Sequence, residues 1–276
     1  MPQLFDRIVL LECAGLQWRD LRVTFAVSRT STSKPNKAEI KVWNLSETSR
    51  VAVAAKGAAL RLSAGYANAT GGNVGVVFAG QVDFAQSARD GPDIVTTIYA
   101  ADGRTAWARA ASKSWSAGTP HADLVAYLAN EMGLALAPTS LANVKGSARG
   151  PFALYGYAHR DLDTLLAGLG LQWSIQEGVL QIVAPDAAVQ GVAIVLSPES
   201  GLIGSPEVAE PKKAKGKTRP ALKCKALLQP ELAPGRRVRL QARDHAGDYR
   251  IDRADHAGDS YEGDFVTALH LSAVAQ

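Results

Sequence analysis

The sequence predicts a mainly β protein of the α+β class, in which two small β-barrel domains flank or enclose an α/β insert. Residues 1–110 and 186–276 alternate apolar and polar side chains in short runs separated by turn residues, as half-buried strands of barrels do. Residues 111–185 instead place apolar side chains at helical spacing and end in a hairpin pattern. A chain of 276 residues is long enough for these three domains to have cores of their own.

In the first domain, Leu21 to Val27 alternates apolar with polar or small residues, which predicts a strand with one apolar face. The same alternation recurs in residues 38–45, 60–66, 76–82 and 94–100. One short helix is expected after Ser46, because Ser46 is a good N-cap and Glu47 complements the helix dipole. Gly57 can adopt the left-handed conformation that ends such a helix.

The insert is expected to contain two helices and a hairpin. Thr119 can cap the first helix and Pro120 suits its first position. Leu124, Leu128 and Met132 form its apolar stripe, and Gly133 ends it. A second helix is predicted over Asp161 to Leu169, where leucines form one stripe, and the Glu177-Gly178 pair then predicts a hairpin turn.

In the second β domain, strands are predicted over residues 192–196, 222–228, 238–242, 249–253 and 264–273. Residues 209–221 are rich in Pro, Gly and Lys, and we expect an exposed, mobile loop there. Its candidate contact residues are Lys212, Lys213, Lys215, Lys217 and Arg219. A solvated loop is the favoured interpretation, and the alternative is a positive patch that faces DNA or an acidic partner.

The pentapeptide DHAGD occurs twice, at Asp244 to Asp248 and at Asp255 to Asp259, and both copies are expected to be loops. Their Asp and His side chains would make a metal cluster only if the two loops met. We expect the copies at opposite ends of one strand of about five residues, roughly 15 Å apart, so no metal site is predicted.

The sequence also lacks catalytic constellations. It has no GxSxG elbow, no GxxxxGK phosphate loop and no histidine pair at the spacing of a zinc helix. Asp161 and Asp163 are two residues apart at a helix start and point to different faces, so they are not expected to act as a glycosidase pair. Cys13 and Cys224 lack CxxC spacing and are expected to be buried hydrophobes. No catalytic residue, cofactor, secretory signal or membrane anchor is predicted.

Several segments, in order along the chain, resemble the baseplate hub family of tailed phages. FDRIVLLE, LRVTFAVSRTSTSKPNKAEIKVWNLSE, LRLSAGY, GVVFAGQVD and IYAADG resemble that family's first barrel. LYGYAHRDLDTLLAGLGLQWSIQEGVLQIV resembles its α/β insert, and LSPESGLIGSPE with LKCKALLQPELAPGRRVRL resembles the start of its second barrel. YRIDRADHAGDSYEGDFVTALHL resembles its last hairpin, with a structural turn motif formed by His256, Gly258 and Asp259. The lysine-rich segment departs from the pattern.

The resemblance implies a non-enzymatic structural subunit of the virion, assembled in the host cytoplasm. It implies a homotrimer in which two barrels per chain make a ring of six similar units around a channel. The ring would adapt a threefold tail spike to the sixfold tail tube or distal tail proteins, with the tape-measure protein as a further partner and with DNA passing through the channel. The alternatives are a tail-associated cell-wall hydrolase and a nucleic-acid-binding module that uses the basic segment.

Overall fold

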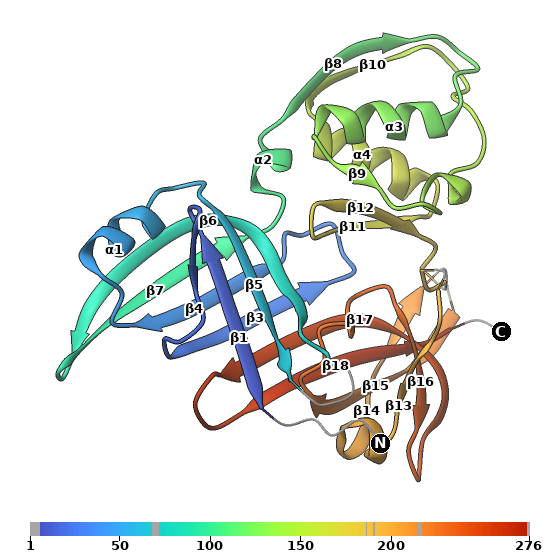
Figure 1. Ribbon diagram of the computed structural model, residues 1–276. Coiled ribbons are helices and arrows are strands. Elements are labelled where there is room, and N and C mark those ends of the chain that lie inside the picture. Colours follow the sequence, from blue (N-terminus) through green and yellow to red (C-terminus); the bar gives the residue numbers. More distant parts are fainter. Residues whose placement is uncertain (1–5, 68–71, 186, 190, 215–216, 275–276) are drawn as a thin grey trace.

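The computed structural model describes residues 6–67, 72–185, 187–189, 191–214 and 217–274, with the backbone alone over 211–214 and 217–219. Figure 1 shows a large sheet built from both ends of the sequence, with the insert stacked on one side of it. The insert follows strand β7 and returns to the sheet through β12, so both of its connections lie at the same side.

Seven strands and one helix form the N-terminal part of the sheet. The strands are β1 (Arg7–Cys13), β2 (Leu16–Trp18), β3 (Val23–Thr30), β4 (Lys37–Trp43), β5 (Ala59–Tyr66), β6 (Gly75–Asp90) and β7 (Asp93–Ala101). Helix α1 (Glu47–Val53) begins as predicted, because the Ser46 side chain accepts a hydrogen bond from the Ser49 amide. The expected place of Gly57 directly after the C-cap is wrong: the C-cap is Ala54, so Gly57, with a positive φ of 84°, lies further along in the turn after the helix.

The insert is a small layered unit. A two-stranded ribbon covers two helices, and a three-stranded sheet lies on the other side of them (Figure 1). Its elements are α2 (Arg104–Trp107), β8 (Ala110–Trp115), α3 (His121–Glu131), β9 (Ala135–Leu136), β10 (Phe152–Tyr157), α4 (Ala158–Gly168), β11 (Gln172–Gln176) and β12 (Val179–Val183). The predicted Glu177-Gly178 turn joins β11 to β12, with both residues at positive φ.

Two details of the insert differ from the sequence prediction. Thr119 does not cap α3: its hydroxyl donates to the carbonyl of Ser116, and Pro120 occupies the N-cap position with extended backbone. Helix α4 begins at Ala158, three residues before the predicted Asp161, because Ala158 and Leu162 continue its buried stripe.

The C-terminal strands complete the large sheet. They are β13 (Ile194–Leu196), β14 (Leu202–Ala214), β15 (Lys217–Leu227), β16 (Arg237–Gln241), β17 (Ala246–Asp259) and β18 (Phe265–Ala273). The expected loop at 209–221 is wrong for the described part of that range: residues 209–214 and 217–221 continue β14 and β15, which pair from Lys212 with Arg219 to Ala214 with Lys217. Pairing of the two arms satisfies backbone groups that a loop would leave to water.

A single path of paired strands runs through both β regions, in the order β14, β15, β18, β17, β3, β4, β7, β6, β5, β1, β2. The long strand β17 connects them, because it pairs with β16 and β18 on the C-terminal side and with β3 on the N-terminal side. Within the described residues, this path does not close on itself, so the strand pairing shows a mainly β fold and an open sheet.

Three hydrophobic clusters form the interior. One is built by β1 to β7 together with Leu228 and Phe265, the second lies within the insert, and the third lies among the C-terminal strands. The contribution of Phe265 to the first cluster shows that the C-terminal hairpin completes the N-terminal core. The division at residues 110 and 185 stays a prediction, although the three clusters follow it closely.

Candidate functional site

The predicted motif of His256, Gly258 and Asp259 lies in β17, so the expected loop at the second DHAGD copy is wrong. His256 is 1% exposed, and its Nδ1 is 2.9 Å from the hydroxyl oxygen of Thr267 on β18. Burial, with the charge of Arg29, lowers the pKa of His256 to about 3. A neutral imidazole therefore forms part of the contact between the two final strands.

Gly258 is required by two aromatic rings. A Cβ built at this position would lie 2.6 Å from Phe25 of β3 and 2.6 Å from Phe265 of β18. The two rings meet edge to face, 5.9 Å apart, and both are buried. A side chain at Gly258 would therefore separate the rings that link the first and last β regions.

Asp259 forms the charged end of the same motif. Its carboxylate accepts hydrogen bonds from the Arg22 guanidinium, at 2.6 and 3.2 Å, and from the Tyr261 amide at 2.9 Å. Burial acts to raise the pKa of Asp259, but these donors outweigh it and hold the pKa below its usual value. The motif attaches β17 to the N-terminal strands through the rings around Gly258, the Arg22 pair of Asp259 and the ladder with β3, and we name this contact the β seam.

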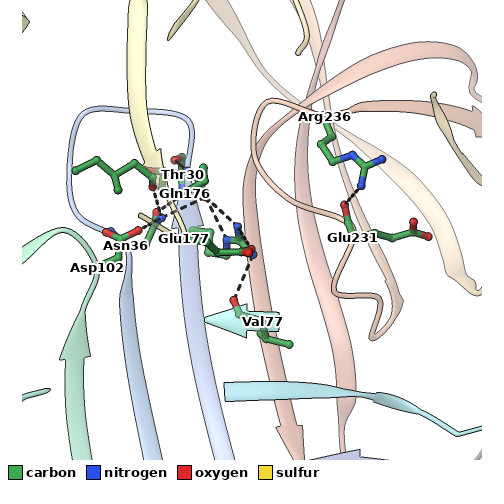
Figure 2. Close-up of polar contacts among 10 residues, drawn as sticks. Thr30, Asn36, Val77, Asp102, Gln176, Glu177, Glu231 and Arg236 are labelled. Atoms are coloured by element: carbon green, nitrogen blue, oxygen red, sulfur yellow. Dashed lines mark hydrogen bonds and ion pairs between the residues drawn. The ribbon is translucent and has the colours of Figure 1, made fainter. Parts of the chain in front are cut away.

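A second contact attaches the insert to the sheet through side chains, and we name it the insert junction. Arg29 of β3 is 2% exposed, and its guanidinium donates to Gln176 at 3.2 Å and to Glu177 at 3.0 Å. It also donates to the carbonyl of Val77 on β6. Figure 2 shows Gln176 of the insert hairpin beside Thr30, whose carbonyl accepts from the Gln176 amide at 2.8 Å. Because two segments converge on it, Arg29 fixes the hairpin against the sheet.

Asn36 and Asp102 extend the insert junction (Figure 2). The main-chain amide of Asn36 donates to one carboxylate oxygen of Asp102 at 2.8 Å, and its side-chain Nδ2 donates to the other at 2.6 Å. Nδ2 also donates to the carbonyl of Ile175 at 2.9 Å. Burial raises the pKa of Asp102 to about 6, although the Asn36 bonds and the charge of Arg29 act to lower it. The junction thus holds a carboxyl group that titrates near neutral pH.

A buried ion pair holds the segment that leaves the insert. Arg250 donates to Asp252 within β17, at 2.7 and 2.9 Å, and both residues are buried. The same guanidinium donates to the carbonyls of Ala184 and Ala187, which follow β12, at 3.2 Å each. A second buried arginine of the large sheet therefore holds the segment through which the chain leaves the insert.

A cavity of about 480 Å³ lies beside the insert junction. The sheet lines it with Cys13, Arg61 and Gln81, and the insert lines it with Met132 and Glu177. Burial raises the pKa of Cys13 to about 11, so its thiol is protonated at neutral pH.

The remaining predicted residues stay apart from these contacts. Lys212, Lys213, Lys217 and Arg219 lie along the paired arms of β14 and β15, where only the backbone is described, and Lys215 is outside the described residues. Asp161 and Asp163 are both in α4, where Asp163 accepts from the Trp173 indole at 3.0 Å. Cys13 and Cys224 are buried and unpaired, as expected.

The described residues contain no group of three or more His, Cys, Asp or Glu side chains arranged to hold a metal ion. No described helix is both long and apolar enough to cross a membrane.

Sequence reasoning missed Arg29, although the sequence held a signal for it. Val23, Phe25 and Val27 occupy the buried face of β3, and Arg29 continues the same alternation. A cation at an apolar position of a strand indicates a buried polar partner.

Solved structures with the same fold are tail proteins or secretion-system components. The 43 kDa tail protein of prophage MuSo2 from Shewanella oneidensis gives a TM-score of 0.68 at 9% identity, covering 97% of this chain and 98% of that chain. A tail protein from Neisseria meningitidis gives 0.65 at 12% identity, covering 97% of each chain. The E. coli c3393 protein, a type VI secretion component, gives 0.63 at 11% identity, covering 96% of this chain and 77% of that chain. At identities of 12% or less, these similarities establish the fold of the chain.

A family model supplies the identity that the fold alone leaves open. No curated protein sequence matches this chain. The model for baseplate hub gp41 matches residues 11–241, which include all of the insert and most of both β regions. The chain therefore belongs to the baseplate hub gp41 family and is a structural protein of the phage tail baseplate.

Proposed function

We propose that the chain forms a homotrimeric ring in which its two β regions act as six barrel-like units around a channel. One observation carries the proposal: strand β17 joins the two β regions through continuous pairing with β3, so each chain presents two β units in one fixed arrangement. Three such chains give six units, the number that a sixfold tube requires.

In this ring the hub adapts a threefold spike to the sixfold tail tube, with distal tail and tape-measure proteins as further partners. Two neighbours support a position beside a spike. The E. coli c3393 protein is described as similar to the T4 tail proteins gp27 and gp5, and a Francisella PdpA–VgrG complex gives a TM-score of 0.62 at 7% identity, covering 58% of that chain. The ring would assemble in the host cytoplasm and become part of the virion.

The lysine-rich arms of β14 and β15 remain a candidate charged contact within this proposal. They form the far end of a hairpin that extends the edge of the sheet. An arm that faces the channel would meet the passing DNA, and an arm that faces outward would meet an acidic partner. DNA binding distinguishes the two when it is measured at increasing salt for the native chain and for a chain with Lys212, Lys213, Lys217 and Arg219 changed to alanine. If the arm meets DNA, the alanine changes should make the fall of affinity with salt less steep, because each phosphate contact adds to that slope.

Native mass spectrometry of the purified chain tests the trimer. The expected result is a species of three times the 29.1 kDa chain mass that persists on dilution. A chain that stays monomeric at high concentration and is absent from purified particles would contradict the proposal.

A further inference from the structure

Strands β8 and β10 of the insert form an isolated two-stranded ribbon. They pair only with each other, from Phe152 with Trp115 to Tyr157 with Ala110, without any register shift. Figure 1 places the ribbon at the far side of α3 and α4 from β11 and β12, away from the large sheet. One face of the ribbon packs in the insert core, and among the described strands no third strand pairs with either edge.

The ribbon has one buried face and one open face. Leu154 and Ala111 lie in the core of the insert, with Phe152 packed against it. The alternate residues of β10 are Ala153, Tyr155 and Tyr157, and Tyr155 is 88% exposed while Tyr157 is 48% exposed. The open face therefore presents two tyrosines from neighbouring positions of one strand.

The edge of β10 has unused main-chain groups. Ala158 donates its amide to the carbonyl of Arg109 at 3.0 Å, which makes this a hydrogen-bonded pair of the antiparallel ladder. By alternation, the N–H and C=O groups of Ala153, Tyr155 and Tyr157 point away from β8. In the described part of the chain, these groups make no hydrogen bond to a third segment.

This edge lacks the features that normally prevent strand addition. The outermost strand of the large sheet, β14, contains Pro206 and Pro211, and its register shifts between Ile203 and Glu207 and again between Ala209 and Lys212. Prolines and bulges of this kind block edge-to-edge pairing. Strand β10 contains no proline, no bulge and no charged residue.

Within the two chain segments that contain the ribbon, the Lys and Arg side chains are not offset by any acid. Residues 103–122 and 141–160 contain no Asp or Glu. Four exposed cations lie on or beside the strands, and none forms an ion pair in the part of the chain that the structure describes: Arg109, Lys113, Arg149 and Arg160. The Arg160 guanidinium lies over the ring of Tyr157, 5.3 Å from its centre. Such a surface favours a partner that is acidic and extended.

We propose that the open edge of β10 binds an extended acidic segment of another tail protein, which adds a third strand to the ribbon. Its backbone would pair with Ala153, Tyr155 and Tyr157, and its carboxylates would meet Arg149 and Arg160. This docking surface is separate from the β seam and from the insert junction, because none of the ribbon residues takes part in either contact.

A model peptide tests the proposal on the full chain. The probe is a fluorescein-labelled peptide of alternating valine and glutamate, with a valine–lysine peptide and an oligothymidylate as comparison ligands, and binding is measured by fluorescence anisotropy. Ala153→Pro removes an outward N–H of β10 and leaves its bonds to β8, while Ser112→Pro makes the matched change on the outer edge of β8. Arg149→Glu with Arg160→Glu reverses the charge beside β10, and Lys56→Glu with Arg89→Glu makes the same change elsewhere.

The acidic peptide is expected to bind saturably and the lysine peptide is not. Ala153→Pro should weaken binding by roughly fivefold or more, because at least one backbone hydrogen bond is lost. The Arg149 and Arg160 reversal should weaken it by roughly tenfold, and neither matched control should change it.

Three results would overturn the proposal: no saturable binding of the acidic peptide, equal binding by the Ala153→Pro chain, or an equal loss with Ser112→Pro. Tighter binding of oligothymidylate through the same arginines would also overturn it, because the surface would then bind nucleic acid.

Discussion

The β seam and the insert junction both join segments that are far apart in sequence, but they do so by different means. At the β seam, main-chain pairing runs from Thr30 with Arg253 to Thr24 with Asp259, and aromatic rings close over Gly258. At the insert junction, β11 shares no strand pairing with β3, and the contact depends on the side chains of a few residues, chiefly Arg29, Asn36 and Asp102.

This difference indicates which parts of the hub behave as one unit. Main-chain pairing is cooperative and survives the loss of one side chain, so the two β regions should unfold together. A contact made by side chains can be lost at a single position, so the insert can be loosened without disturbing the sheet.

The largest effect is expected at the β seam from Gly258→Val. The new side chain would meet both Phe25 and Phe265, which are buried, and overpacking of this kind destabilises by about 3 kcal/mol, the upper end of its usual range. Urea denaturation measures the loss. Gly150→Val is the matched control, because a Cβ at Gly150 would meet nothing within 4 Å. Equal stability of the two variants would show that the rings do not hold the seam.

At the insert junction, Arg29→Met should destabilise the protein by roughly 2–3 kcal/mol, since charged hydrogen bonds to Gln176, Glu177 and Val77 are lost. Hydrogen exchange should quicken in β11 and β12 and stay unchanged in β17. Arg61→Met, at a half-exposed arginine, is the control. Faster exchange spread equally over β3 and β17 would contradict the separation of the two contacts.

The insert junction should also depend on pH through Asp102. Its folded pKa of about 6 lies above the ordinary value of 3.8, so its stabilising contribution is present below pH 3.8 and is lost as the pH rises through 6. Asp102→Asn removes this dependence. The stability of the variant relative to the native chain should therefore rise between pH 4 and pH 8, by on the order of 2–3 kcal/mol.

The measurement is denaturation at a series of pH values, with Asp90→Asn as the exposed control. Arg29, whose charge acts on Asp102, is present in both chains, so its own contribution largely cancels in the difference. A difference that does not change with pH would contradict the raised pKa.

The smallest effect is expected from Asp259→Asn at the β seam. Arg22 is one-third exposed, so solvent screens the pair, and we expect a loss of about 0.5–1 kcal/mol. Calorimetry in low and high salt measures it, with Asp264→Asn as the more exposed comparison. A loss as large as that of Gly258→Val would show that charge, and not ring packing, dominates the seam.

Local patterns predicted the local structure well. The α1 cap at Ser46, the Glu177-Gly178 turn and the helical stripe through Leu124 and Leu128 are all confirmed, because each depends on neighbours within a few residues. The extent of β17 was not predictable in this way. Gly258 and Asp259 have the composition of a turn, and only the packing of Phe25 and Phe265, distant in sequence, makes them strand residues.

The candidate site shows the same limit. The motif residues were identified from the sequence, but the partners of Arg29 lie nearly 150 positions away, on a hairpin whose placement depends on the whole fold. The open edge of β10 could not be predicted from the sequence either. Leu154 is buried and Tyr155 exposed only because α3 and α4 cover one face of the ribbon.

Electron cryomicroscopy of the assembled baseplate tests the central claim most directly, because it counts the copies of this chain around the tail axis. We predict three copies, each contributing two β units to one ring between a threefold spike and a sixfold tube. Six copies around the axis, or a position away from the spike, would contradict the adaptor role.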